Sequence, residues 1–416
     1  MRLPWWRSTA VPALPVLVAA GSLFLLQRGT PWRGEWLWTV DWACGATVLL
    51  APLVAGCAAH DAALLRTDGM LELRRSCVRG PRGVLGPVAA AGAVGTAVLL
   101  GIVLTALVLT ATTGPTGTPP LQLVPVAVQA LVTAAAVGAV VGSRLPVLVA
   151  APVAGAAVYV VSILSARGTV PDLFRVGGST GTLTGLAWDR WFLLWLTGAL
   201  LAWSLTGLAV AARSSLVGPR RTTTLGLLVV ALVAVGTTTA LAHRPDRFVP
   251  RAVELRCEGE RPRVCVASTS TRSLDSLVRR TARLDARLRA AGVSTVPVVA
   301  QVVPGHRPSR SAGALFIESS DVNRPTVPWR TAARYLTTPT PCPGYTASTP
   351  PPGPVFEAQA ALAAWLEMSV GAGDARSWRG APWHDWLTAS PSRQRAWLVR
   401  TYDQLRRCDL EAVRAP

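Results

Sequence analysis

The seven cysteines are the residues of this chain whose spacing most directly indicates chemistry. Three lie early, at positions 44, 57 and 77, and the other four lie beyond residue 243. An even number of cysteines in a region outside the cell is typical of disulfide bonds. We therefore predict two disulfides among the late cysteines, which are Cys257, Cys265, Cys342 and Cys408.

The neighbouring sequence suggests how these cysteines pair. Segments 253–257 and 263–268 are each typical of a short strand, and in a hairpin Cys257 and Cys265 would face each other. The remaining two cysteines then pair by elimination, although four cysteines allow three pairings. A zinc ion held by four thiolates is the competing interpretation, but the short Cys-x-x-Cys pairs that such sites use are missing.

Nucleophilic catalysis has little support in the sequence. Residues 177–181 match the Gly-x-Ser-x-Gly pattern, but they lie in a connection between apolar segments and not between a strand and a helix. His306 and His384 are isolated, and we expect surface or structural roles for both. The chain has no lysine, which excludes a phosphate-binding loop with its Lys and a Schiff base. We predict no catalytic residue, no cofactor, no metal and no enzymatic activity.

Two parts of the chain differ sharply in composition. Residues 8–243 are mostly Ala, Val, Leu and Gly, whereas residues 244–416 are rich in Arg, Pro, Ser and Thr. The net charge is +19, but the arginines flank apolar segments or are spread along the second part. No basic stripe interleaved with aromatic residues is present, so we expect no nucleic-acid partner. The use of arginine alone as the basic residue is typical of a GC-rich genome, as in an actinobacterium.

The first part contains apolar runs of about 20 residues, which is the length that crosses the hydrocarbon core of a bilayer. Residues 121–165 are too long for one span and are divided by a short turn at 143–146, where Pro146 suits the first turn of a second helix. We predict about seven transmembrane helices within a domain of residues 1–243. The predicted spans are 10–27, 37–59, 84–112, 121–143, 145–165, 191–212 and 222–242.

The flanking residues predict an orientation for these spans. With the N-terminus in the cytoplasm, eleven arginines lie on the inner segments and five on the outer ones. An odd number of spans then places the C-terminal domain outside the cell membrane. We expect the tryptophans at the span ends to be interfacial anchors. These are Trp5, Trp6, Trp32, Trp36, Trp38, Trp42, Trp188 and Trp191.

The longest predicted cytoplasmic connection, residues 60–83, mixes apolar and charged residues as a short amphipathic helix does. One interpretation is a basic helix lying on anionic lipid headgroups. The other is a docking helix for a cytoplasmic partner. The charged residues that would contact such a partner are Arg66, Asp68, Glu72, Arg74, Arg75 and Arg79.

The second part, residues 244–416, predicts a small α+β domain. Leucines at helical spacing indicate a helix at 271–291 that ends at Gly292, and strands are expected at 296–303 and 314–318. Further helices are predicted at 355–369 and 391–412, after a proline-rich loop. Five tryptophans in this domain form either its core or a surface for a partner. They are Trp365, Trp378, Trp383, Trp386 and Trp397.

The arrangement resembles the permease subunits of type-2 ABC exporters from actinobacteria. The similarity covers roughly residues 8–243, in the N-in helical bundle and the basic connection between the second and third spans. Residues 257–291, with Cys257 and the strand Val264-Cys265-Val266, resemble an outer domain found on some of these permeases. Two features depart from the family: it usually has six spans, and the amphipathic helix before the first span is barely present here.

The resemblance implies a permease-like subunit that depends on a separate ATPase, with residues 62–79 as the coupling segment that docks on it. Membrane lipids and this ATPase are the expected partners, and a homodimer is compatible with the family. The alternative function is a membrane anchor that transports nothing and displays a disulfide-stabilised binding domain. Capture of an ATPase would favour the first function, and independent binding by the detached domain would favour the second.

Overall fold

The chain folds as two compact units. The helical unit comprises residues 1–180 and 187–249, and the C-terminal unit comprises residues 181–186 and 250–416. A two-stranded sheet pairs β1 (Leu186–Trp188) with β2 (Phe248–Pro250). The computed structural model describes residues 8–27, 29–30, 32–66, 85–115, 117–167, 173–213, 236, 238–239, 247–303, 313–315, 326–337, 342 and 353–416.

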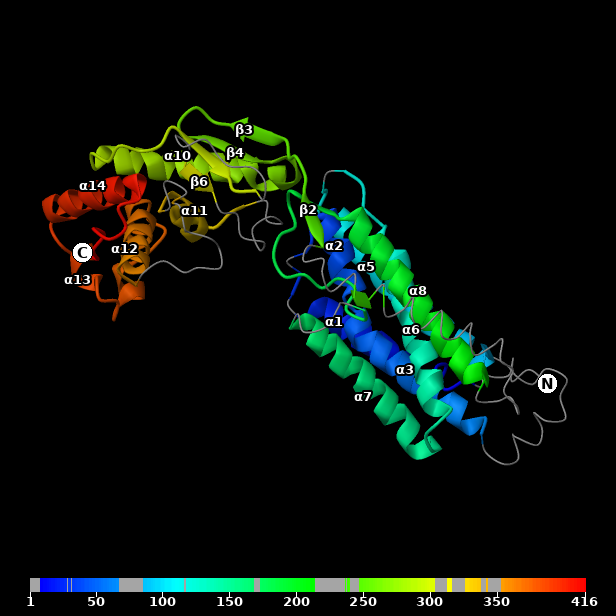
Figure 1. Ribbon diagram of the computed structural model, residues 1–416. Helices are drawn as coiled ribbons and strands as arrows, with labels where there is room; N and C mark the ends of the chain where they lie inside the picture. The colour runs from blue at the N-terminus through cyan, green and yellow to red at the C-terminus, as the bar shows by residue number, and fades with distance from the viewer. Residues whose placement is uncertain are drawn as a thin grey trace. The chain divides into compact units, whose positions relative to one another are not determined.

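The helical unit is built from long apolar helices (Figure 1). Within the described ranges, five segments are long and apolar enough to cross a membrane. The first of them consists of two consecutive helices, α2 and α3. Among the described residues, the helices of this unit are α1 (Leu14–Leu26), α2 (Trp36–Cys44), α3 (Thr47–Leu64), α5 (Leu85–Ala111), α6 (Leu123–Gly142), α7 (Val147–Ala166) and α8 (Arg190–Arg213).

Five of the seven predicted spans coincide with these segments, and the other two have different outcomes. The segment predicted at 10–27 forms only the 13-residue helix α1, because turns occupy residues 9–13 and Pro15 lies in the first turn of the helix. Its length is below the roughly 20 residues that span a bilayer. Only residues 236, 238 and 239 of the span predicted at 222–242 are described, so that span stays a prediction. Pro146 lies directly before α7, as its N-cap.

Helix α3 lies at the centre of the unit and contacts α1, α5, α6 and α7. Its contact with α6 depends on two glycines, because a Cβ atom at Gly138 or Gly142 would lie 2.1 Å from the carbonyl oxygen of Ala55 or Ala59. Apolar helices in a bilayer associate by such close backbone packing, since the lipid is as apolar as their side chains. The small residues therefore hold α3 and α6 together.

Hydroxyl and amide groups connect α6 to α8. Thr133 Oγ1 lies 2.8 Å from Ser204 Oγ and donates to the carbonyl of Leu200 at 3.0 Å. The amide of Gln129 also donates to Ser204 Oγ, at 2.9 Å. Polar groups inside an apolar bundle need such partners, because an unpaired one is costly to bury.

The C-terminal unit contains a four-stranded sheet in the order β3-β4-β5-β6. The hairpin of β3 (Leu255–Glu258) and β4 (Arg263–Ala267) is antiparallel, whereas β4, β5 (Val298–Gln301) and β6 (Gly313–Leu315) are parallel neighbours. Helix α10 (Leu274–Ala290) connects β4 to β5, as the crossover between parallel strands requires. The prediction of a small domain with both helices and strands is confirmed. Part of its sheet is parallel.

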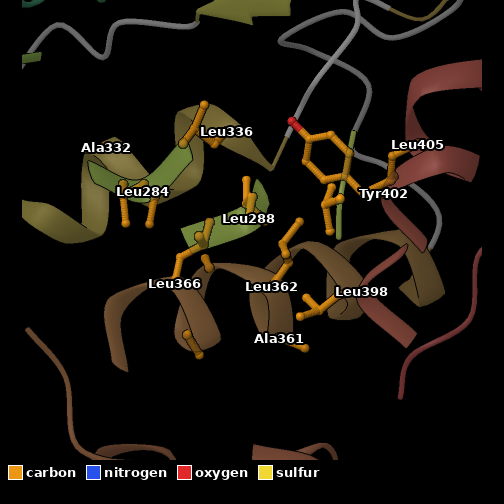
Figure 2. Packing of buried hydrophobic residues seen from close by; sticks show 14 of the residues in the cluster. Leu284, Leu288, Ala332, Leu336, Ala361, Leu362, Leu366, Leu398, Tyr402 and Leu405 are labelled. Carbon is orange, nitrogen blue, oxygen red and sulfur yellow. The ribbon is translucent and has the colours of Figure 1, made fainter. Parts of the chain in front are cut away.

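A hydrophobic core fills the space between the sheet and the remaining helices. These helices are α11 (Trp329–Leu336), α12 (Gly353–Ser369), α13 (His384–Leu387) and α14 (Pro391–Arg407). Figure 2 shows leucines of α10, α12 and α14 meeting in this core beside Tyr402. The helix predicted at 391–412 ends early, at Arg407, because Cys408 adopts a left-handed conformation with φ of 58°. Helix α11 and the short α13 were not predicted.

Two cysteine pairs lie at disulfide distance in this unit. Cys257 and Cys265 are directly opposite in the β3–β4 hairpin, with sulfurs 2.05 Å apart. The second pair, Cys342 and Cys408, joins residues 66 positions apart in the sequence. These are the two pairs that the hairpin and elimination arguments select.

Candidate functional site

The most unusual polar group of the helical unit is the carboxylate of Asp41, which is completely buried in α2. Its side chain is enclosed by the bundle. One oxygen, Oδ2, accepts the backbone N–H of Ser179 at 2.6 Å. The other, Oδ1, has no hydrogen-bond partner among the described residues. Burying a carboxylate in an apolar bundle costs several kcal/mol, so such a residue is a candidate for function.

The partner of Asp41 is a loop of residues 173–180, which packs against the junction of α2 and α3. The backbone N–H of Gly178 donates to the carbonyl of Asp41 at 2.9 Å. Trp38 Nε1 donates to the carbonyl of Ser179 at 3.0 Å, and the N–H of Val176 donates to Thr47 Oγ1 at 3.3 Å. Residues on both sides of the junction therefore hold the 173–180 loop in place.

Glycines allow the 173–180 loop to approach the α2–α3 junction closely. A Cβ atom at Gly45 would lie 2.7 Å from the Cα of Gly178, and one at Gly177 would lie 2.2 Å from the carbonyl oxygen of Asp41. Gly177 also has a φ of +93°, which side chains other than that of glycine rarely tolerate. At Gly45 and Gly177 the loop and the α2–α3 junction thus meet backbone to backbone, and a side chain at either position would collide.

Positive charge on the loop side compensates the buried carboxylate. Arg175 and Arg247 both interact electrostatically with Asp41. Arg247 Nη2 also donates to the carbonyl of Arg175 at 3.2 Å. The site therefore combines a buried acid, two guanidinium groups and a glycine-rich loop, and the acid holds that loop through the N–H of Ser179.

A second buried carboxylate, Asp61, lies near the end of α3 and anchors the segment that precedes α1. Its oxygens accept the hydroxyls of Ser8 and Thr9 and the backbone N–H of Thr9, which lies 3.0 Å from Oδ1. These contacts are typical of an acid that satisfies exposed N–H groups at the start of a helix. We therefore assign Asp61 a structural role.

Three tryptophans that were expected to anchor at the membrane interface lie inside the bundle instead. Trp32, Trp38 and Trp42 are no more than 3% exposed. The indole N–H of Trp42 donates to the carbonyl of Leu25, and its ring lies 5.2 Å from that of Phe24. Trp191 is half exposed, as an anchor should be. The expectation was wrong for these three because they are buried within the unit, where Trp42 contacts α1 and Trp38 bonds to the 173–180 loop.

Most of the predicted docking residues cannot be located in the structure. Arg66 is exposed in the turn that follows α3, whereas Asp68, Glu72, Arg74, Arg75 and Arg79 lie outside the described residues. The docking surface stays a prediction. The Gly-x-Ser-x-Gly pattern is the 173–180 loop itself, and its backbone at Ser179 is engaged by Asp41 and Trp38. Among the described residues, no group of three His, Cys, Asp or Glu could hold a metal ion.

The five tryptophans of the C-terminal unit mostly form its core. Trp383, Trp386 and Trp397 are 3–5% exposed, and the rings of the last two lie 4.5 Å apart in an edge-on arrangement. Trp378 is partly buried, with the guanidinium of Arg330 5.2 Å from its ring. Core packing, one of the two interpretations, is therefore the main role of these residues.

Two ionisable groups in the C-terminal unit are perturbed by burial. Burial raises the pKa of Glu367, and attraction from Arg330 and Arg334 opposes this only in part. Burial also raises the pKa of Tyr402 above its ordinary value, with a further contribution from nearby Asp285. Asp285 forms an ion pair with Arg289 at 2.8 Å.

Sequence reasoning missed the contacts of Asp41, although signals for parts of the site exist. A carboxylate within an apolar run is itself a signal, and the pair of glycines at 177–178 indicates close backbone approach. Gly138 and Gly142 form a Gly-x-x-x-Gly pattern, which predicts close helix packing in membranes. No local pattern, however, indicates that Ser179 is the partner of Asp41.

One comparison with known proteins gives a match, in the C-terminal unit. Residues 264–408, about a third of the chain, match a family described as Domain of unknown function (DUF7224). The match begins in β4 and ends at Cys408, so it covers the sheet from β4 onward and most of the helices of this unit. No curated protein and no solved structure matches the chain.

Proposed function

We propose that this chain is a permease-like membrane subunit of an ABC export system that obtains ATP hydrolysis from a separate ATPase. In this proposal the N-terminus and residues 60–83 lie in the cytoplasm, and the C-terminal unit lies outside the cell membrane. The bundle provides the path for the substrate, and the charged residues of the 60–83 connection contact the ATPase.

The observation that carries the proposal is the buried carboxylate of Asp41 and its hydrogen bond to the 173–180 loop. Asp61 is buried too, but both of its oxygens accept hydrogen bonds, whereas Oδ1 of Asp41 has no partner among the described residues, and an apolar residue at position 41 would be less costly to bury. A transporter, in contrast, needs polar groups in its interior and segments that separate and close again. In this proposal the 173–180 loop is the segment that moves, and its hydrogen bonds to Asp41 and Trp38 break and form again.

Capture of an ATPase in the native membrane tests this proposal. The full chain, expressed at its native level and crosslinked before solubilisation, should recover an ATPase subunit. Charge reversal at Arg74 and Arg75 should abolish the recovery, because these residues lie in the proposed docking segment. Arg144→Glu is the matched control: it reverses an exposed arginine in the turn between α6 and α7, on the same proposed side of the membrane. The proposal is contradicted if the wild type recovers no ATPase, or if the Arg74 and Arg75 changes leave the recovery of the ATPase unaffected.

A second candidate function is a membrane anchor that displays the C-terminal unit for binding. This unit favours the idea because it has its own hydrophobic core and two cysteine pairs at disulfide distance. The two functions are separated by fusing residues 250–416 to an unrelated membrane anchor in a strain that lacks the chain. Full restoration of the wild-type phenotype supports the anchor, and failure despite a folded, displayed domain supports the permease.

A further inference from the structure

Helix α10 exposes a row of arginines on the side that faces away from the hydrophobic core. Arg279, Arg283 and Arg287 are exposed and follow one another at intervals of four residues, so they lie along one side of the helix. We call these three residues the α10 ridge. At a rise of about 1.5 Å per residue, the ridge is about 12 Å long. The exposed face of this helix carries one carboxylate, that of Asp275, because Asp285 is buried.

The positive charge of the α10 ridge is not neutralised by ion pairs. No carboxylate among the described residues lies within ion-pair distance of its three guanidinium groups, whereas Arg289 of the same helix pairs with Asp285 at 2.8 Å. Arg280 borders the ridge, with its guanidinium 4.8 Å from the ring of Trp329. Burial lowers the pKa of Arg280, and repulsion from the charge of Arg279 lowers it further. The ridge is therefore a surface of unbalanced positive charge, which a bound anion would stabilise.

The buried side of α10 holds the ridge in a fixed arrangement. Leu277, Leu284 and Leu288 are fully buried in the core of the C-terminal unit. The helix ends in a closed turn, in which the N–H of Val293 donates to the carbonyl of Leu288 at 3.0 Å. The three arginines therefore project from a rigid element, and a ligand does not have to order their backbone on binding.

The length of the ridge determines which anions fit it. Successive arginines of the ridge are about 6 Å apart along the helix axis, so their guanidinium groups would have to converge against their mutual repulsion to bind one small anion. A linear polymer with an acidic group in each repeat can contact them in succession. The planar guanidinium forms charged hydrogen bonds with both carboxylates and phosphates, so the ridge suits either acid.

We propose that the α10 ridge binds a linear polyanion. Its arginines pair with successive acidic groups of the polymer, and Arg280 adds a fourth cation at the edge of the ridge. A single-stranded nucleic acid is disfavoured because α10 has no aromatic side chain on which bases could stack. A lipid surface is disfavoured because helices that lie on a bilayer insert an apolar face, whereas the apolar face of α10 is buried in the core.

Fluorescence anisotropy with labelled long-chain polyphosphate tests this proposal on the full chain in nanodiscs of neutral phosphatidylcholine. We expect saturable binding that weakens as salt is added, and poor competition by pyrophosphate, which is too short to follow the ridge.

Two variants with the same change in charge separate the ridge from the rest of the surface. The ridge variant carries Arg279→Gln, Arg283→Gln and Arg287→Gln, and the control variant carries Arg379→Gln, Arg393→Gln and Arg400→Gln, which alter arginines exposed elsewhere in the C-terminal unit. The ridge variant should bind polyphosphate about tenfold more weakly or worse, and the control variant should lose less than about threefold. Lysine at the three ridge positions keeps the charge, so binding should stay within about threefold of the wild type, which distinguishes lost charge from a lost fold.

Four results would overturn the proposal. The first is equal weakening in the ridge variant and the control variant, which would indicate diffuse attraction to a basic surface. The second is pyrophosphate binding as tight as that of polyphosphate, which would leave a simple anion site. The third is a loss in the lysine variant as large as that in the ridge variant. The fourth is cosedimentation with phosphatidylglycerol vesicles as tight, per anionic charge, as polyphosphate binding, which would assign the ridge to a lipid surface. None of these outcomes depends on transport or on an ATPase, so they leave the proposed function to its own experiment.

Discussion

Adding one methyl group at Gly138 should disrupt the packing of α6 against α3. The Cβ atom of an alanine there would lie 2.1 Å from the carbonyl oxygen of Ala55, and 2.8 Å from the carbonyl carbon. Both neighbours belong to helix backbone, so they cannot rotate away as a side chain can. The two helices must separate by about 1 Å, and overpacking of this kind costs about 1–3 kcal/mol.

The matched control for this change is Gly101→Ala. Gly101 lies within α5, and a Cβ atom there meets nothing within 4 Å. Both substitutions gain the same helix propensity, about 1 kcal/mol, so the difference between them isolates the packing cost. A difference of about 1–3 kcal/mol lowers the midpoint of thermal unfolding by roughly 2–12 °C in the Gly138→Ala protein relative to the control.

The reaction of Cys57 with a thiol dye during heating provides the assay. Cys57 lies in α3 and is 9% exposed, so it reacts when the bundle opens. A Cys77→Ser background removes the signal of the cysteine in the 60–83 connection. Equal midpoints for the Gly138→Ala and Gly101→Ala proteins would refute the close contact between α3 and α6.

Two further predictions concern the C-terminal unit. Replacing both Cys342 and Cys408 by serine should lower the free energy of unfolding of this unit by about 4 kcal/mol, and replacing Cys257 and Cys265 should lower it by about 2.5 kcal/mol. The first loss is larger because opening the longer loop gives the unfolded chain more entropy. Denaturant titration measures both losses, and a larger loss for the shorter loop would contradict this prediction. The raised pKa of Glu367 means that its contribution to stability is greatest below the pKa of the unfolded chain and is lost as the pH rises through the folded value. Glu367→Gln should therefore raise the free energy of unfolding at pH 7 and have little effect on it near pH 4. If the variant and the wild type have equal free energies of unfolding at both pH values, the burial argument is refuted.

The sequence predicted the parts of the fold that have a local pattern. Apolar runs located the five long helical segments, and the strand pattern around Cys257 and Cys265 placed these residues opposite each other in a hairpin. Leucines at helical spacing located α10, because its buried and exposed faces alternate regularly.

What the sequence did not predict depends on contacts between distant residues. Asp41 bonds to Ser179 across 138 positions, through a backbone N–H that every residue type except proline has. Trp38 bonds to the same residue, Ser179, and is buried for that reason. Its position near a span end gives no means to distinguish such burial from interfacial anchoring.

The central claim is that the chain crosses the membrane with the 60–83 connection inside and the C-terminal unit outside. Labelling of intact, gently reduced cells with a membrane-impermeant maleimide tests it most directly, since buried Cys44 and Cys57 should stay silent. We predict labelling of the four late cysteines in intact cells, and of Cys77 only after the membrane is permeabilised. Labelling of Cys77 in intact cells with protection of the late cysteines would invert the chain, and both the ATPase contact and the disulfides would then lose their basis.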